Sequence, residues 1–146
     1  MELIMRKAQE QDLDGLDQVM LVISDRAGDR ETVKGLLEKI NGDPQKYLLV
    51  AEDKETGTIC GSLLGVVFED ICDTCRPILM VENVAVLESY QGKGVGRKMF
   101  EAIEDWGKNV WNCHYEILVS GLNRTGAHKF YHALGFSEVK GFKKYL

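Results

Sequence analysis

The segment from Ile78 to Val110 constrains the fold more than any other part of the chain, because it joins three different local patterns. Its first part, ILMVENVAV, is rich in apolar and β-branched residues and predicts a central strand, although Glu82 and Asn83 interrupt it. Apolar residues recur at helical spacing from Val95 onward and predict an amphipathic helix. The stretch QGKGVG between the two has three glycines at alternate positions, so a strand–turn–helix unit is expected here.

A glycine-rich turn at the start of a helix is a common site for phosphate groups. The first N–H groups of a helix have no partner within it, and the helix dipole makes this end positive. Glycines lack a Cβ atom, so their N–H groups can approach an anion closely. Two nucleotide-binding motifs are excluded: G-x-G-x-x-G would need glycine where Arg97 or Met99 stands, and the Gly-Lys-Ser/Thr end of a P-loop is absent. The turn therefore predicts an anion site of another kind.

The rest of the sequence predicts a mixed α/β or α+β fold, expected to be one domain over residues 1–146. Apolar runs predict strands at residues 3–8, 47–53, 59–70 and 115–122, and one or two closing strands within 136–146. Helical spacing predicts helices within residues 12–24, 30–40 and 123–135. Asn123 or Thr125 is expected to cap the last helix, and Gly135 to end it.

Composition and charge argue against several classes of protein. The net charge of −5 argues against a general nucleic-acid-binding role, which usually shows as a basic excess. No apolar run approaches the roughly 18 residues that span a bilayer, and the N-terminal residues lack the features of a secretory signal. We therefore expect a cytoplasmic protein that binds neither nucleic acid nor membranes.

The cysteines and histidines do not complete a metal motif. Cys72 and Cys75 form one C-x-x-C, which is half of a zinc site, and Cys113–His114 is the single candidate complement. The two histidines of HKFYH stand at i and i+4, but lysine replaces the glutamate of H-E-x-x-H. No metal is expected, and a zinc-dependent interaction domain built on Cys72 and Cys75 is kept as an alternative.

The pattern Gln91-x-x-Gly94-x-Gly96 resembles the acyl-CoA pyrophosphate signature Q/R-x-x-G-x-G/A of the GNAT superfamily of N-acetyltransferases. The later stretch LNRTGAHKFYHALGF resembles the Asn…Ala…F-Y-x-x-x-G-F element of the same family, at the expected separation. The order of predicted elements also matches, so the resemblance covers nearly the whole chain. It implies an α/β fold with a central, mostly antiparallel twisted sheet of six to seven strands, splayed at the central strand and flanked by about four helices.

The resemblance implies acetyl transfer from acetyl-CoA to a primary amine by direct attack, without an acyl-enzyme intermediate. Backbone groups at the end of the central strand are implied to hold the pantetheine and the thioester, and the glycine turn to hold the pyrophosphate. Local cations would offset the charge of coenzyme A, which is about −4 at neutral pH. The implied cofactor-binding residues are Val84, Ala85, Val86, Gln91, Gly92, Lys93, Gly94, Val95, Gly96, Arg97, Asn123, Ala127 and Tyr131.

Two side chains are candidates for proton transfer. An alkylammonium has a pKa of about 10.4, so the acceptor must lose a proton, and Glu82 is the candidate base, acting directly or through water. The departing thiolate must be protonated or stabilised, and Tyr131 stands where the family's general-acid tyrosine falls. The stretch VENVAVLESYQGKGVG is similar to that of glucosamine-6-phosphate N-acetyltransferases. Asn83 stands where an aspartate is expected there, so that substrate is not carried over.

The sequence leaves the acceptor open. A small-molecule amine is favoured, and the acidic residues Glu69, Asp70 and Asp73 hint at a cationic acceptor such as a polyamine or an aminoglycoside. A protein or peptide amine is an alternative acceptor, and a non-catalytic acyl-CoA-binding sensor is an alternative function. Homodimers are common in the family, so the resemblance allows a second copy as a partner.

Overall fold

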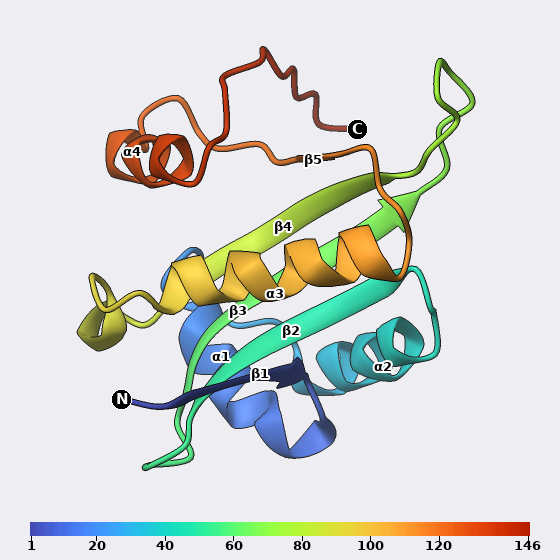
Figure 1. Cartoon of the computed structure of the whole chain (residues 1–146). Coiled ribbons are helices and arrows are strands. Elements are labelled where there is room, and N and C mark those ends of the chain that lie inside the picture. Colours follow the sequence, from blue (N-terminus) through green and yellow to red (C-terminus); the bar gives the residue numbers. More distant parts are fainter.

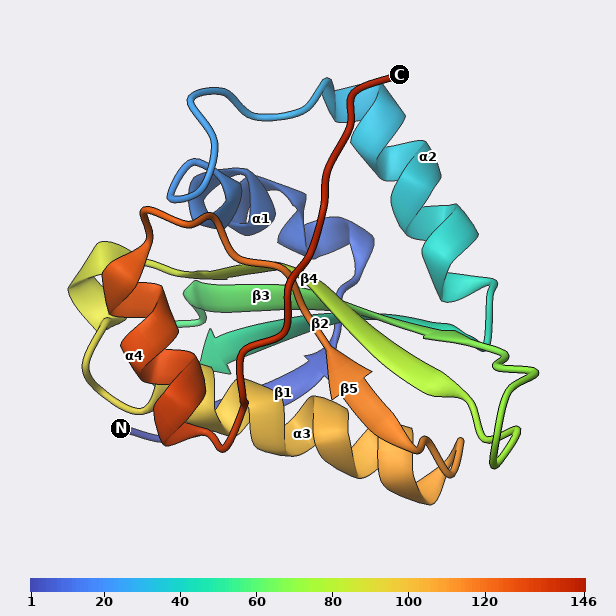
Figure 2. The same cartoon turned by 90° about the horizontal axis from the view of Figure 1, so that it is seen from above.

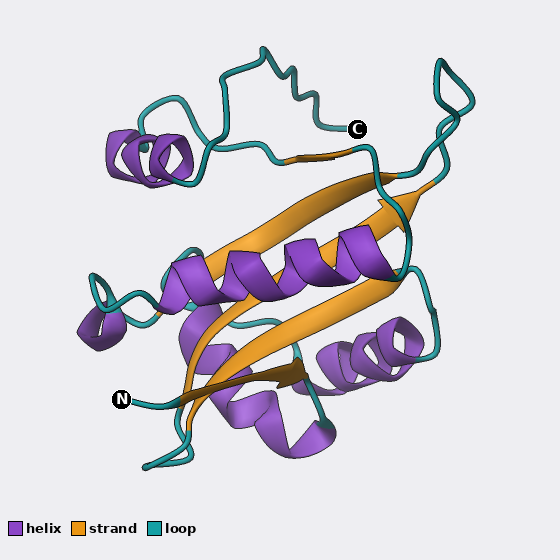
Figure 3. Cartoon of the chain, in the orientation of Figure 1, coloured by secondary structure: helices purple, strands orange, loops and turns teal.

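The computed structural model describes residues 1–146 as a mixed α/β fold built on one five-stranded sheet (Figures 1 and 3). In chain order the elements are β1 (Leu3–Lys7), the short 3₁₀ helix η1 (Glu10–Asp12), α1 (Leu13–Met20), α2 (Arg30–Asn41), β2 (Lys46–Asp53), β3 (Ile59–Phe68), β4 (Ile78–Val86), η2 (Glu88–Tyr90), α3 (Val95–Asn109), β5 (Tyr115–Ile117) and α4 (Thr125–Ala133). The strand order is β1-β2-β3-β4-β5, antiparallel from β1 to β4 and parallel between β4 and β5. The predicted strand–turn–helix unit is confirmed as β4, η2 with the glycine turn, and α3.

The sheet has fewer strands than the six to seven expected. β5 covers only the first part of the predicted strand 115–122, and residues 136–146 form no strand (Figure 3). A strand needs a neighbour for its backbone groups, and no residue within 137–146 makes a backbone–backbone hydrogen bond. Apolar residues of the expected closing strands are exposed, among them Val139, Phe142 and Tyr145.

Helices cover both faces of the sheet (Figures 1 and 2). α3 lies on one face, and α1 and α2 lie on the other. The alternation along β2 divides its side chains between two apolar cores. Leu49 and Ala51 belong to the core under α3, whereas Val50 belongs to the core under α1 and α2. The sheet is therefore buried from both sides, and its central strands have a fixed position relative to α3.

Two glycines of β3 allow α3 to lie close to the sheet. A Cβ atom at Gly61 would be 2.6 Å from the sulfur of Met99, and a Cβ atom at Gly65 would be 2.6 Å from Cδ1 of Ile103. Contacts this short do not occur in close-packed interiors, so larger residues would push α3 outward. The two glycines therefore set how closely α3 approaches the sheet.

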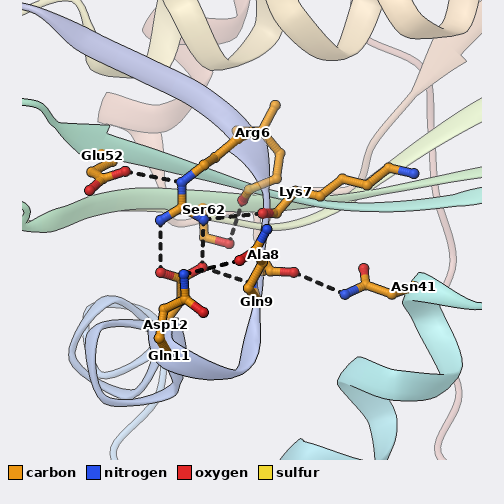
Figure 4. A network of polar contacts seen from close by, with 10 residues as sticks. Arg6, Lys7, Ala8, Gln9, Gln11, Asp12, Asn41, Glu52 and Ser62 are labelled. Carbon is orange, nitrogen blue, oxygen red and sulfur yellow. Dashed lines mark hydrogen bonds and ion pairs between the residues drawn. The ribbon is translucent and has the colours of Figure 1, made fainter.

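Arg6 of β1 joins the edge of the sheet to the turn that precedes α1 (Figure 4). Its guanidinium donates to both carboxylate oxygens of Asp12, at 2.7 and 2.8 Å, and to Glu52 of β2 at 3.0 Å. Asp12 is only 4% exposed and also accepts from the backbone N–H of Gln9, at 2.8 Å. Burial alone would raise the pKa of Asp12, but the hydrogen bonds from Arg6 and Gln9 and the Arg6 charge lower it below its ordinary value.

Asp12→Asn is expected to lower the free energy of unfolding by about 3 kcal/mol, because removing one partner of a largely buried ion pair leaves the other charge uncompensated. The pair also makes stability depend on pH. Since the pKa of Asp12 is lowered in the folded protein, its stabilisation is complete above the unfolded pKa of about 3.9 and is lost as pH falls through the folded pKa. Denaturant unfolding at pH 7 and pH 3 measures both effects.

The control for this prediction is Asp14→Asn, which removes a carboxylate that is 93% exposed and also pairs with an arginine. Exposed ion pairs contribute little, so this variant should unfold like the wild type. Equal stability of the two variants would show that the Arg6–Asp12 pair does not stabilise the fold.

Candidate active site

The regular pairing of β4 changes near its middle: it is interrupted by a bulge on the β3 side and ends on the β5 side. On the β3 side, two residues of β4, Asn83 and Val84, lie opposite the single residue Leu63. This arrangement is a β-bulge, and Asn83 within it has a φ of +53°. On the β5 side, the parallel pairing ends at Met80 and Ile117. The sheet is therefore splayed between β4 and β5 beyond this point, as the resemblance implied.

The opening between β4 and the chain after β5 is a cleft of about 140 Å³. Glu82 reaches it from β4 and Tyr131 reaches it from α4, so the structure brings together the two residues predicted to transfer protons. The residues that line the cleft are Ile23, Val81, Glu82, Asn83, Val84, Leu118, Val119, Arg124 and Tyr131. Its charged side chains, Glu82 and Arg124, have opposite signs.

Three phenylalanine rings pack against Tyr131. The ring centroids of Phe100, Phe130 and Phe136 lie 6.0, 5.5 and 5.8 Å from that of Tyr131. Burial raises the pKa of the Tyr131 phenol; the charge of Arg124 opposes this shift, and the charge of Glu82 adds to it. The phenol is therefore protonated at neutral pH, as an ordinary tyrosine is, and it is a weaker acid than an ordinary tyrosine.

The turn between η2 and α3 presents a row of unpaired backbone N–H groups. No N–H group of residues 92–97 donates to a protein acceptor, and no side chain caps α3. Gly92 and Gly94 have φ values of +75° and +83°, in the left-handed region that favours glycine. Gly94 is the N-cap of α3, so the unpaired groups lie at the positive end of the helix dipole. Such an arrangement can bind a phosphate or pyrophosphate group.

Gly96, the third glycine of the turn, is required for packing. A Cβ atom at Gly96 would lie 2.8 Å from the ring of Phe130, so glycine here lets α4 pack against the first turn of α3. From the sequence, all three glycines were expected to serve the anion. In the structure, two of them meet a backbone requirement and Gly96 meets a steric one.

The cations beside this turn are available to a ligand. Lys93, Arg97 and Lys98 are exposed, and none of them forms an ion pair. The ammonium of Lys93 lies 5.6 Å from the centroid of the Tyr90 ring, which is a cation–π distance. Positive charge is thus concentrated at the turn of a protein whose net charge is −5.

Val84, Ala85 and Val86, whose backbone is expected to hold the pantetheine, lie between the cleft and the glycine turn. Val84 lines the cleft, and Ala85, only 4% exposed, follows it along β4. The carbonyl of Val86 accepts from the side-chain amide of Gln91, at 3.0 Å. The side chain of Gln91 therefore turns back toward β4 and fixes the start of the turn.

Asn123 and Ala127, the other predicted cofactor-binding residues, lie at the start of α4. The predicted capping by Asn123 or Thr125 is wrong: the N-cap is Arg124, and no side chain makes the capping hydrogen bond. The exposed side chain of Asn123 thus remains free for a ligand. The end of the helix is as predicted, since α4 stops just before Gly135, which has a φ of +97°.

Several residues singled out in the sequence lie away from the cleft. Glu69, Asp70 and Asp73 belong to the loop between β3 and β4, at the end of β4 opposite the glycine turn, and none of them lines the cleft (Figure 1). Cys72 and Cys75 are exposed in the same loop, and no group of three or more His, Cys, Asp or Glu is placed to hold a metal ion. None of the helices has the length and apolar character needed to cross a bilayer.

Two features of the cleft were missed from the sequence. Helical spacing places Ile23 in a helix, but α1 ends at Met20 and Ile23 contributes to the cleft wall instead. The bulge at Asn83 was not predicted either, although a signal for it exists: asparagine tolerates the left-handed region, and it interrupts an apolar strand here. Arg124, the N-cap of α4, also lines the cleft together with Tyr131.

Several known proteins similar to this chain are described as acetyltransferases. The chain is 30% identical over 69 residues to aminoglycoside N(6')-acetyltransferase type 1 of Salmonella typhimurium, a match that covers 47% of this chain and 46% of that protein. The match thus spans about half the length of this curated relative. Among solved structures, glucosamine-6-phosphate N-acetyltransferase from Arabidopsis thaliana has a TM-score of 0.87 and 21% identity over 99% of both chains. The aminoglycoside N-acetyltransferase AAC(6')-Iy in complex with CoA has a TM-score of 0.83 and 20% identity, over 99% of this chain and 94% of that chain.

These structural neighbours show that the fold is shared. The sequence profile of the acetyltransferase (GNAT) family matches residues 15–136, which include β4, the glycine turn, α3 and α4. The chain therefore belongs to the acetyltransferase (GNAT) family.

Proposed function

We propose that this protein is an acetyl-CoA-dependent N-acetyltransferase that acetylates a primary amine of a small molecule by direct attack. The observation that carries the proposal is the arrangement of the cleft and the glycine turn at the two ends of one segment, from the bulge of β4 to the start of α3, with α4 beside the cleft. A cleft with a carboxylate and a phenol opens at the bulge of β4, and a row of unpaired N–H groups follows at the start of α3. A ligand with a thioester at one end and a pyrophosphate further along suits both features. Membership of the GNAT family supports the same activity.

Different residues are proposed to bind different parts of acetyl-CoA. The N–H groups of residues 92–97 would bind the pyrophosphate, and Lys93 and Arg97 would offset its charge. The backbone of Val84–Val86 would lie along the pantetheine, with Asn123 and Ala127 on the α4 side. Acetyl-CoA supplies the acetyl group as a thioester, from which the acceptor amine displaces the thiolate.

In this proposal the protein moves two protons. Glu82 accepts, directly or through a water molecule, the proton that the amine must lose as its bond to the acetyl carbon forms. Tyr131 donates its proton to the sulfur as the carbon–sulfur bond breaks, and regains a proton from solvent. Direct attack needs no nucleophile from the protein. Burial raises the pKa of the Cys60 thiol to about 11, which suits a packed side chain rather than a nucleophile.

The acceptor is tested by a panel of amines with detection of the released CoA thiol. The panel contains simple amines, amino sugars, polyamines, amino acids and peptides. Acetylation of a small amine with an equal amount of CoA released supports the proposal. Turnover limited to peptides would favour a protein or peptide acceptor, and tight acetyl-CoA binding with no turnover would favour a non-catalytic acyl-CoA-binding module.

Glu82→Gln is expected to lower kcat/KM for the amine about 100-fold at pH 7, because the amide cannot accept the proton. The loss should shrink toward pH 10, where much of an alkylamine is already unprotonated. Rates with the best amine of the panel, measured from pH 7 to pH 10, test this. Glu101→Gln, which removes an exposed carboxylate from α3, is the matched control and should behave like the wild type. A loss that stays constant with pH would contradict a role for Glu82 as base.

A further inference from the structure

A hydrogen bond outside the cleft joins the glycine turn to the far end of β2. The phenol of Tyr90 donates to Oδ2 of Asp53 at 2.8 Å. Tyr90 is the last residue of η2 and directly precedes Gln91, where the turn begins, whereas Asp53 is the last residue of β2. The two residues thus connect segments that are 37 positions apart in the chain.

Asp53 is itself held in place by the turn between β2 and β3. It is 6% exposed, and its Oδ1 accepts from the backbone N–H of Glu55 at 3.0 Å. Its own N–H donates to the carbonyl of Thr58 at 2.9 Å, and its carbonyl accepts from Gly57 at 2.8 Å. The hydrogen bond from Tyr90 lowers the pKa of Asp53 most; burial opposes it, and the hydrogen bond from the N–H of Glu55 adds to it, so the carboxylate is charged at neutral pH. Tyr90 therefore donates to a fixed, charged acceptor, and such hydrogen bonds are stronger than neutral ones.

The position of Tyr90 affects the N–H groups of the anion site. Its backbone N–H donates to the carbonyl of Leu87 at 2.8 Å, which closes η2, and the ammonium of Lys93 lies over its ring. Beyond Gln91, no backbone N–H group is bonded until Lys98 donates to the carbonyl of Gly94. The glycine turn is thus held at one end by η2 and Gln91 and at the other end by α3. Tyr90 anchors the η2 end to Asp53, at the start of the turn between β2 and β3.

We infer that Tyr90 and Asp53 are positioning residues that keep residues 91–97 in the conformation that binds the pyrophosphate. The inference rests on the proposed function. Neither side chain lines the cleft, so the pair acts on acetyl-CoA affinity and leaves the proton transfers unchanged. A turn that is already ordered binds more tightly, because less conformational entropy is lost on binding.

The test is Tyr90→Phe, which removes the hydroxyl and keeps the ring that packs against the core. The Kd and the KM for acetyl-CoA should rise about tenfold, because a turn that is no longer anchored loses more conformational entropy on binding, while kcat stays within about twofold of the wild type. Asp53→Ala should have the same effect, and the double variant Asp53→Ala/Tyr90→Phe should be no weaker than either single variant. Asp53→Asn keeps an oxygen acceptor and should recover part of the affinity. Tyr47→Phe, which removes a hydroxyl from a half-buried tyrosine of β2, is the control with unchanged constants.

Calorimetric titration with acetyl-CoA distinguishes a failure of the proposed function from a failure of the positioning role alone. A wild-type protein that binds no acetyl-CoA would overturn the proposed function and this inference with it. Wild-type binding together with unchanged affinity in Tyr90→Phe would overturn the positioning role alone. A fall in kcat as large as the rise in KM, or additive losses in the double variant, would also overturn it.

Discussion

Gly94→Val is expected to abolish acetyl-CoA binding, with the affinity falling at least about 100-fold, while the protein still folds. A β-branched residue is strongly disfavoured at the φ of +83° that Gly94 adopts. No atom lies within 4 Å of the position that a Cβ at Gly94 would occupy, so backbone strain rather than a clash decides the outcome. The turn will relax toward negative φ and reorient the N–H groups around it. Losing two hydrogen bonds to a charged group, each contributing about 1.5–3 kcal/mol, accounts for a change of this size.

Gly135→Val is the matched control for Gly94→Val. Gly135 also has a positive φ, +97°, and a Cβ atom added there would likewise have no atom within 4 Å, but Gly135 lies after the end of α4. Both variants should lose about 1–2 kcal/mol of stability in thermal unfolding, because both place a Cβ atom in the left-handed region. Only Gly94→Val should lose binding in calorimetric titration. Equal affinities of the two variants would contradict the assignment of the turn to the pyrophosphate.

The strands were predicted correctly where an apolar run in the sequence also has a neighbouring strand to pair with. β2, β3 and β4 each have a partner on both sides for at least part of their length, and their apolar runs predicted them. The segment after Ile117 and the segment 136–146 also contain apolar residues at intervals, but they have no neighbour to pair with. Periodicity describes which face of a strand is buried. It contains no information on whether a second strand lies within hydrogen-bonding distance, so the strand count was too high.

The candidate site was predictable to the extent that its chemistry lies in continuous motifs. The glycine turn, Glu82 and Tyr131 were proposed from short patterns, and the structure brings Glu82 and Tyr131 to one cleft. The contact of Gly96 with Phe130 and the hydrogen bond from Tyr90 to Asp53 were not found. Both join residues that are more than 30 positions apart, and a single sequence gives no sign of such a contact.

Tyr131→Phe is expected to lower kcat about 100-fold or more while the affinity for acetyl-CoA changes less than about twofold, because only the proton donor is lost. The phenyl ring keeps its contacts with Phe100, Phe130 and Phe136, so the fold and the shape of the cleft should be preserved. The pH dependence gives a second measurement. Since the pKa of Tyr131 is raised, wild-type kcat should not decline through loss of this proton until the pH exceeds the ordinary phenol value of about 10.

Tyr145→Phe is the control for the loss of a phenol, because Tyr145 is 85% exposed near the C-terminal end and makes no contact with the cleft. Steady-state kinetics on the best amine of the panel, with calorimetric titration of acetyl-CoA, separates kcat from binding. Unchanged kcat in Tyr131→Phe would mean that water or another group protonates the thiolate, and the tyrosine would then serve only to close the cleft. Loss of kcat and affinity together would instead indicate that the phenol holds the thioester in place, since a group that acts only in the transition state lowers kcat alone.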